Sequence, residues 1–121
     1  MKFIIDHDLH VHTHLSPCSG DPTQTPERVI ADAGAAGLKT VCITDHYWDE
    51  LVSPGWDFYG GQTYERLSSL LPLPKKEEFE LLFGCEADVS HDRVIGISPA
   101  RYDAFDFISI PLTASSRRKP S

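Results

Sequence analysis

Histidines are concentrated at the start of this 121-residue chain, where His7, His10, His12 and His14 occur within the first fourteen residues. On a strand, His10 and His12 project to the same side, because alternate side chains of an extended chain share a face. Two neutral imidazoles on one side could bind a single divalent cation, for which histidine nitrogen is a common ligand. A surface run of histidines or a tag remnant is the alternative. A tag would not be embedded in a strand pattern and followed by a capped helix, so the sequence favours a metal site.

Two further candidate ligands follow apolar segments later in the chain. His46 comes after the segment 38–44, and Glu86 comes after the segment 80–85. Taken singly, a histidine or glutamate at such a position is more typical of a cap or a solvated surface. The carboxyl ends of parallel strands, however, converge on one functional face. We therefore expect one cavity to collect four candidate metal ligands: His10, His12, His46 and Glu86.

Apolar segments alternate with helix signals along the chain, which predicts an α/β fold with a mostly parallel sheet. The predicted strands are 3–5 continuing through Leu9 and Val11, then 38–44, 80–85 and 107–111. Thr25 and Pro26 provide an N-cap and a first helical proline, which predicts a helix that ends at Gly37. Shorter helices are expected at 63–71 and 99–105. The long segment 47–61 carries Trp48 and Trp56, which could line a substrate pocket or simply pack the loop.

Composition and charge exclude several classes of protein. Eleven Lys and Arg against 18 Asp and Glu give a formal net charge of -7, which disfavours nucleic-acid binding. No apolar run approaches the ~20 residues of a membrane helix, and no signal-peptide core is present. We therefore expect a cytoplasmic protein with no nucleic-acid and no membrane partner. The cysteines, Cys18, Cys42 and Cys85, are odd in number and widely spaced, which predicts reduced thiols rather than disulfides.

At the candidate ligands the chain resembles the PHP (polymerase and histidinol phosphatase) family of metal-dependent phosphoesterases, and histidinol phosphatases in particular. Residues 8–13 (DLHVHT) resemble the first motif of the family, residues 43–46 (ITDH) the second, and residues 84–86 (GCE) the third. The resemblance covers residues 3–113. It implies the N-terminal part of a distorted (β/α)7 barrel, with about four parallel strands and covering helices. A complete site would hold two or three divalent ions of zinc, manganese or iron.

The resemblance also implies roles for individual residues. His10, His12 and Glu86 would hold one metal, Glu86 would bridge to a second, and His46 would belong to another position of the cluster. Asp45 would support the ligands from behind or cap the chain locally. The loop 16–21 often supplies a further ligand in this family. The spacing does not decide whether Cys18 or Asp21 is this ligand. Asp21 is slightly preferred as the ligand, but a role in a turn or a helix cap is preferred to metal binding by either residue. Two other histidines, His14 and His91, are expected to be exposed.

The function that this resemblance implies is hydrolysis of a small phosphomonoester such as histidinol phosphate. Clustered metals would lower the pKa of a bound water and orient the phosphate; no other catalytic group is identified. One alternative is a non-catalytic metal-binding or inactive half-barrel fragment. Another is a zinc hydrolase of the amidohydrolase type, which also begins with a His-x-His motif. The second and third motifs favour the PHP family over this last alternative.

The chain departs from the family in its second half. Only about four strands can be counted, and the later motifs of the family, including its closing Asp-x-His, are absent from the sequence. We therefore expect impaired activity, and self-association through the open barrel edge. Residues 1–113 are expected to form a partial PHP domain and 114–121 a disordered tail. The tail has two candidate origins. One is a frameshift that replaced a His-Leu-His reading by Ala114-Ser115-Ser116. The other is a shortened expression fragment.

Overall fold

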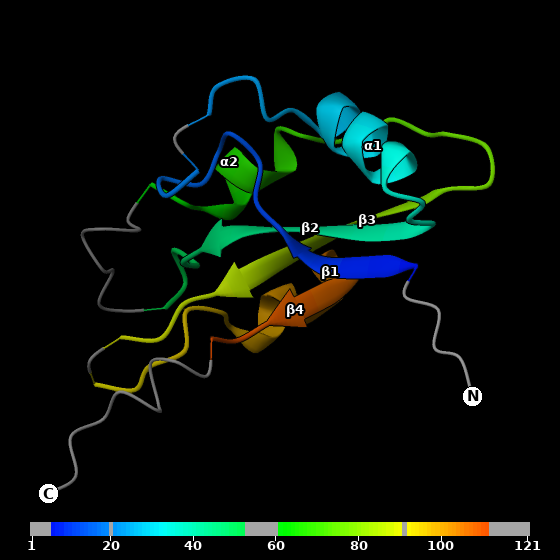
Figure 1. Cartoon of the computed structure of the whole chain (residues 1–121). Helices are drawn as coiled ribbons and strands as arrows, with labels where there is room; N and C mark the ends of the chain where they lie inside the picture. Colours follow the sequence, from blue (N-terminus) through cyan, green and yellow to red (C-terminus); the bar gives the residue numbers. More distant parts are fainter. Residues whose placement is uncertain (1–5, 20, 53–60, 91, 112–121) are drawn as a thin grey trace, which may run out of the picture.

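The structure is a computed structural model that describes residues 6–19, 21–52, 61–90 and 92–111. Along the chain it contains β1 (His7–Val11), α1 (Pro26–Ala35), β2 (Thr40–Tyr47), α2 (Tyr64–Ser68), β3 (Glu80–Ala87), the 3-10 helix η2 (Pro99–Ala104) and β4 (Phe107–Ser109). The four strands form one parallel sheet in the order β1-β2-β3-β4 (Figure 1). This curled four-stranded sheet with helices is the partial α/β barrel expected from the sequence.

The two central strands extend farther toward their carboxyl ends than the apolar pattern predicted. The prediction placed strands at 38–44 and 80–85, whereas β2 continues through Tyr47 and β3 through Ala87. As a result, Asp45, His46 and Glu86 lie inside the strands and not after them. Polar side chains are tolerated there because each is paired with other polar groups, which offsets the cost of burying them.

The other elements follow the prediction with shorter bounds. The helix α2 covers only part of the predicted 63–71, and β4 ends at Ser109 where 107–111 was predicted. The predicted first strand is described from His7 onward, and residues 3–5 lie outside the described residues. The tail 114–121 lies outside them as well.

The helix α1 begins where its capping signal predicted and ends at Ala35, two residues before the predicted Gly37. The Thr25 side chain accepts a hydrogen bond from the Arg28 backbone N–H, and Pro26 takes the first helical position. Gly37, just past the C-terminus, has a φ of 79°, a left-handed conformation that glycine adopts without steric cost. On the buried face of α1, Val29 and Ala33 pack against Val41 of β2.

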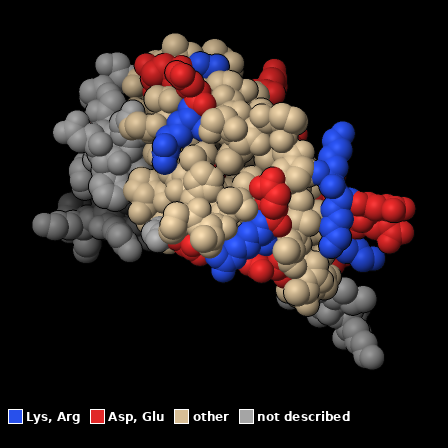
Figure 2. Space-filling view, turned by 90° about the horizontal axis from the view of Figure 1, so that it is seen from above, with Lys and Arg blue, Asp and Glu red and all other residues tan. Residues whose placement is uncertain are grey.

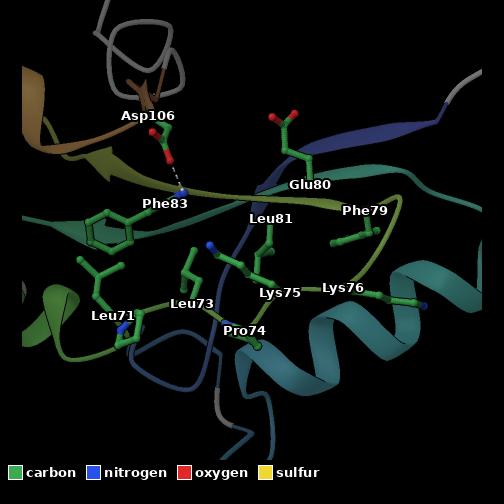
Figure 3. A pocket seen from close by; sticks show the side chains of 11 residues that line it. Leu71, Leu73, Pro74, Lys75, Lys76, Phe79, Glu80, Leu81, Phe83 and Asp106 are labelled. Carbon is green, nitrogen blue, oxygen red and sulfur yellow. Dashed lines mark hydrogen bonds between the residues drawn. The ribbon is translucent and has the colours of Figure 1, made fainter.

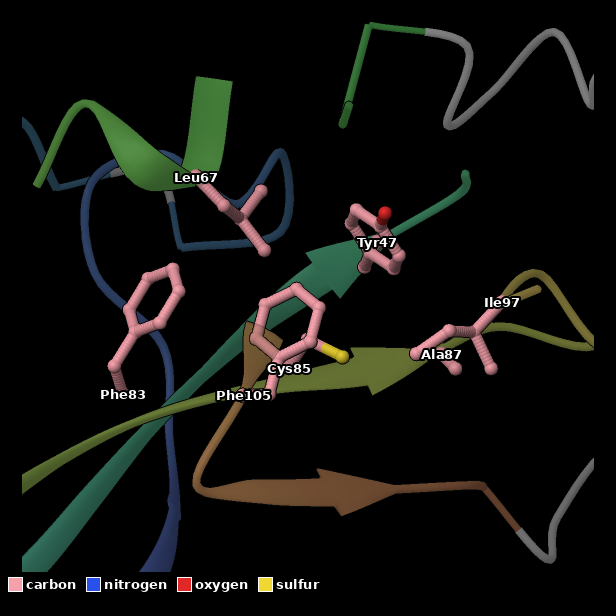
Figure 4. Packing of buried hydrophobic residues seen from close by; sticks show 7 residues of the cluster. All are labelled: Tyr47, Leu67, Phe83, Cys85, Ala87, Ile97 and Phe105. Carbon is pink, nitrogen blue, oxygen red and sulfur yellow. The ribbon is translucent and has the colours of Figure 1, made fainter. Parts of the chain in front are cut away.

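The period-2 alternation of β2 and β3 separates the hydrophobic core from the candidate ligands. The core face carries Tyr47 from β2 and Phe83, Cys85 and Ala87 from β3. Against them pack Leu67 of α2, Phe105 and Ile97, as Figure 4 shows. The side chains of His46 and Glu86 have the opposite parity, so they project from the other face of the sheet.

Gly84, two residues before Glu86, allows β3 to lie close to both β2 and β4. A Cβ at this position would lie 2.5 Å from the Phe107 carbonyl oxygen and 2.6 Å from the Cys42 sulfur. Only a residue without a side chain therefore fits between β2 and β4. In the parallel register of β2 and β3, Gly84 pairs with Thr44, which sets His46 directly opposite Glu86.

No helix in the described part of the chain is long and apolar enough to cross a membrane. All three cysteines are unpaired, with Cys42 and Cys85 buried and Cys18 exposed.

Candidate metal centre

Side chains from three neighbouring strands and one loop meet at the carboxyl-terminal ends of the strands. His10 and His12 come from the end of β1, His46 from β2 and Glu86 from β3. Cys18 comes from the loop that joins β1 to α1. The structure thus brings together the four residues that the sequence proposed as principal ligands.

Potential ligand atoms form three overlapping groups, and within each group the atoms lie no more than 4.8 Å apart. Each group shares a residue with the next, so that neighbouring cation positions would have common ligands. The groups are His12, Cys18 and His46; His10, His12 and Glu86; and His46, Glu86 and Asp88.

Glu86 is the centre of this arrangement. Its Oε1 lies 3.0 Å from His12 Nε2 and 3.3 Å from His10 Nε2. Its Oε2 lies 3.9 Å from His46 Nδ1. The two carboxylate oxygens therefore face different histidines, and Glu86 belongs to two of the three groups of potential ligands.

The edge strand β1 presents its histidines through an irregularity in its pairing. Asp8 pairs with Val41 and Val11 with Ile43, so three steps along β1 match two steps along β2. Such a bulge bends the strand and re-aims the side chains beside it. The Asp8 carboxylate accepts a hydrogen bond from the His10 backbone N–H at 3.0 Å, which supports the bent segment from within.

Asp45 lies next to His46 in sequence but acts on the opposite side of β2. Its buried carboxylate accepts hydrogen bonds from the Thr13 backbone N–H, the Thr13 hydroxyl and the Ser16 hydroxyl, each at 2.7 Å. The Ser16 oxygen in turn accepts a hydrogen bond from the His46 backbone N–H. Asp45 therefore ties the loop after β1 to β2, which is one of the two supporting roles that the sequence had left open for it.

The loop after β1 directs Cys18, and not Asp21, toward the centre. Cys18 Sγ lies 3.3 Å from both His12 Nδ1 and His46 Nε2. The Asp21 carboxylate instead accepts hydrogen bonds from Thr23 and from Arg28, and it belongs to none of the three groups found within the described residues. Asp21 has the turn role that the sequence preferred to metal binding, and of the two candidate ligands it is Cys18 that lies in the cluster.

Asp88 is a site residue that the sequence reasoning missed. It is buried, and its two carboxylate oxygens lie 3.0 and 3.1 Å from His46 Nδ1. The available signal was its spacing, since Asp88 follows Glu86 by two positions and so projects to the same side of an extended chain. His14 is exposed and outside the three groups, and His91 lies outside the described residues.

Opposing influences act on the ionisation of the buried pair formed by His46 and Asp88. Burial by itself would lower the pKa of His46, but the Asp88 carboxylate, with help from Glu86, raises it overall. Burial raises the pKa of Asp88 despite its hydrogen bond with His46. Both groups are therefore shifted toward their protonated forms when no cation is present.

Glu86 responds in the opposite direction. Burial would raise its pKa, but the hydrogen bond with His12 and the neighbouring histidines lower it overall. Burial raises the pKa of Cys18, and nearby carboxylates add to this effect. The cluster thus holds an ionised carboxylate at its centre, as a cation site requires.

Trp48 packs the segment that leads to Asp88. It is buried, its Nε1–H donates to the Val52 carbonyl, and its ring covers Gly96 so closely that a Cβ there would lie 2.5 Å from a ring carbon. The Gly96 N–H donates to the Asp88 carbonyl at 2.7 Å. Of the two roles left open for Trp48, the structure places it in loop packing; Trp56 lies outside the described residues.

A separate groove of 430 Å³ lies beside the amino-terminal half of β3, at the opposite end of that strand from Glu86 (Figure 3). It is lined mainly by Leu71, Leu73, Phe79 and Leu81, and no histidine or cysteine of the described chain lines it. Its Asp106 carboxylate accepts a hydrogen bond from the Phe83 backbone N–H. The groove therefore lacks the ligand chemistry of the strand-end cluster.

Comparison with known proteins agrees with this geometry. A family model described as the PHP domain matches residues 8–116. A curated relative from Caldicellulosiruptor saccharolyticus, named "Probable phosphatase", is 29% identical over 103 residues. The match covers 83% of this chain and 40% of the relative, so the chain spans about two fifths of the length of that protein.

Proposed function

Because this chain belongs to the PHP domain family, we propose that it binds divalent metal ions and serves the hydrolysis of a small phosphomonoester. The proposed ligands are His10, His12, His46 and Glu86, with Cys18 added from the loop. The observation that carries the proposal is the position of Glu86, whose two oxygens face histidines on either side. Asp45 and Asp21 are assigned to support of the loop and not to the metal.

The donor set fits the proposed metals. Imidazole nitrogens with a carboxylate suit zinc, manganese and iron, whereas calcium and magnesium prefer oxygen ligands alone. Two or three such ions would correspond to the overlapping groups around Glu86. A divalent ion bound there supplies Lewis-acid polarisation of the phosphate and activation of water.

The residues of the chain itself have three tasks in this scheme. Glu86 joins neighbouring cation positions, His10 and His12 present their nitrogens from the bulged end of β1, and Asp88 orients the His46 ring. The His10 side chain is 57% exposed, so a dissolved ligand can reach this end of the cluster directly.

The family and the name of the relative, "Probable phosphatase", support the proposed substrate class. A small phosphorylated molecule such as histidinol phosphate remains the proposed substrate. A nucleic-acid substrate is disfavoured by the net charge of -7, and Figure 2 shows acidic side chains interspersed with the basic ones on the face seen from above. A cytoplasmic location, where thiols stay reduced, is part of the same proposal and is consistent with the three unpaired cysteines.

Hydrolysis of p-nitrophenyl phosphate by the full chain tests this function in the presence of zinc, manganese or iron(II). We expect slow release of phosphate that a chelator abolishes, because this chain spans only 40% of its phosphatase relative. Parallel assays use a phosphodiester and an amide substrate. Turnover of the amide alone would replace the proposal by the amidohydrolase-type alternative, and metal binding without any turnover would leave a non-catalytic metal-binding fragment.

Self-association is a second component of the proposal. Within the described sheet, β1 and β4 are the outer strands, and each has one edge without a neighbouring strand. Unpaired edges of this kind are templates for pairing with another chain. Light scattering coupled to size exclusion should therefore show dimers or larger species, and a strictly monomeric chain at high concentration would contradict this component.

A further inference from the structure

Gln62 and Arg66 form a chain of hydrogen bonds that runs from the loop after β1 to the end of β2. We propose that these two are positioning residues for the metal centre, which fix the backbone of His46 relative to that loop and thereby set the affinity for metal. This inference rests on the proposed function, because it concerns the same centre. It adds a role for α2, since neither residue belongs to the groups of potential ligands found among the described residues.

The end of β2 extends past its neighbour β1. The strand β1 ends at Val11, which pairs with Ile43, three positions before His46. Beyond that point, side chains take the place of a neighbouring strand. The His46 backbone N–H donates to the Ser16 hydroxyl, and its C=O accepts from the Gln62 side-chain amide, both at 3.0 Å. Both backbone groups of this buried residue are thereby paired, as burial requires.

Gln62 uses both ends of its side-chain amide. The residue is only 3% exposed, and while its Nε2 donates to the His46 C=O, its Oε1 accepts from Arg66 Nε at 2.8 Å. Its backbone C=O also accepts from the Trp48 N–H, which fastens it to the chain that follows β2. An amide offers a donor and an acceptor at once, whereas a carboxylate only accepts. A glutamate here could therefore keep the bond to Arg66 but not the bond to His46.

Arg66 connects this amide to the loop after β1. Its Nη2 and Nε donate to the Leu15 C=O at 2.9 and 3.3 Å, and the same Nε donates to Gln62. The planar guanidinium supplies these bonds from adjacent nitrogens, which the single nitrogen of a lysine cannot do. Bonds from a charged donor are also stronger than bonds between neutral groups. The loop is thus fastened to the same amide that holds His46.

Two tethers therefore join neighbouring residues of the loop to the backbone of one proposed ligand. The first links the Ser16 hydroxyl to the His46 N–H. The second begins at the Leu15 C=O and reaches the His46 C=O through the Arg66 and Gln62 side chains. Because functional groups must be held to within about 0.5 Å of their productive positions, a loss of either tether should weaken metal binding.

Isothermal titration of Gln62→Glu with zinc tests the inference. This substitution keeps the size of the side chain and the acceptor for Arg66, but it removes the donor to the His46 C=O. We expect zinc affinity to fall by about 10-fold or more, the range typical of residues that support metal ligands. Arg66→Lys keeps the charge and loses the forked geometry, so it should show a smaller fall in the same direction.

Two controls separate positioning from general destabilisation. Glu65→Gln changes an exposed neighbour on α2 and should bind zinc as the wild type does. Val29→Ala removes a buried contact between α1 and β2, so it should unfold at lower urea but keep its zinc affinity. At saturating cobalt(II), the visible absorption bands should change in Gln62→Glu and stay the same in Val29→Ala. Circular dichroism establishes that each variant is folded, and the exposed position of Arg66 lets Arg66→Lys decide the question if Gln62→Glu does not fold.

The outcomes distinguish this inference from the proposed function. Zinc affinity equal to that of the wild type in folded Arg66→Lys and Gln62→Glu would overturn the inference and leave the metal centre in place. An equal loss of affinity in Val29→Ala would also overturn it. A wild-type chain that binds no zinc would refute the proposed function, and this inference with it. In the metal-free chain, amide hydrogen exchange at His46 should be faster in Arg66→Lys than in the wild type, and unchanged exchange would contradict the tether.

Discussion

Thr13 donates two hydrogen bonds to Asp45, one from its backbone N–H and one from its hydroxyl, both 2.7 Å long. The two residues are 32 positions apart, so β2 shapes a loop that belongs to the preceding unit of the chain. That loop carries Cys18 toward His46. Asp45, although adjacent in sequence to the candidate ligand His46, thus holds the loop in place and belongs to none of the groups of potential ligands among the described residues.

Replacing Asp45 by Asn should destabilise the fold more than it affects metal chemistry directly. The amide keeps one acceptor oxygen but loses the charge that strengthens three buried hydrogen bonds, and such bonds contribute about 1.5–3 kcal/mol. We expect a loss of that order in the free energy of urea unfolding. The control is Asp103→Asn, whose carboxylate is exposed on η2. Equal stability of the two variants would show that the tether contributes little.

Replacing Glu86 by Gln should abolish tight metal binding, because the amide cannot act as an anionic ligand between histidines. Mutation of residues that only hydrogen-bond to metal ligands already lowers metal affinity by about 10–100-fold. Mutation of Glu86, a proposed ligand itself, should lower the affinity further. Isothermal titration with zinc and with manganese measures the effect. Glu80→Gln at the exposed start of β3 provides the matched control. Zinc affinity unchanged in Glu86→Gln would remove Glu86 from the proposed site.

Replacing Gly84 by Ala should destabilise the sheet at the point where β2, β3 and β4 meet. The added methyl would approach the Phe107 carbonyl oxygen to 2.5 Å, and a backbone atom cannot yield as a flexible side chain can. Overpacking of this kind costs about 1–3 kcal/mol. Thermal unfolding should show a clear decrease for this variant and almost none for Gly61→Ala, where nothing lies within 4 Å of the added Cβ. Similar melting temperatures for both variants would contradict the close approach.

The contribution of Asp49 to stability should depend on pH. Burial would raise its pKa, but hydrogen bonds from the Leu51 and Ser98 N–H groups and the Ser98 hydroxyl lower it below its ordinary value of 3.8. The ionised carboxylate therefore stabilises the native state above that value, and the contribution is lost as pH falls through the lower folded pKa. Asp49→Asn should be clearly less stable than wild type near neutral pH, and the difference should shrink below about pH 4. A difference in urea midpoint that is constant with pH would exclude this carboxylate as its source.

Much of the fold was predictable from local signals. The cap formed by Thr25 and Pro26 located α1, and the apolar runs located β2 and β3. The ends of these strands were not predictable, because polar residues such as His46 and Glu86 normally mark the end of an apolar strand. Here they continue the strand, since Glu86 contacts His12 just after β1 and His46 contacts Asp88 just after β3.

The candidate site was predictable to the extent that its residues follow strands. His10, His12, His46 and Glu86 meet because parallel strands end together. The choice between Cys18 and Asp21 depends on how the loop bends, and that is set by hydrogen bonds to Asp45 from a distant strand. Asp88 was missed because its role arises from a pairing with His46 across two strands, which no local pattern in the sequence records.

The contact between His12 and Glu86 joins residues 74 positions apart in the chain. A cation held between them would act as a reversible cross-link that closes a long loop, and such links restrict the unfolded chain in proportion to the logarithm of the loop length. It would also fasten an outer strand to the centre of the sheet. When metal is added, amide hydrogen exchange should therefore slow more in β1 than in α1. The metal centre would then stabilise the fold in addition to its role in catalysis.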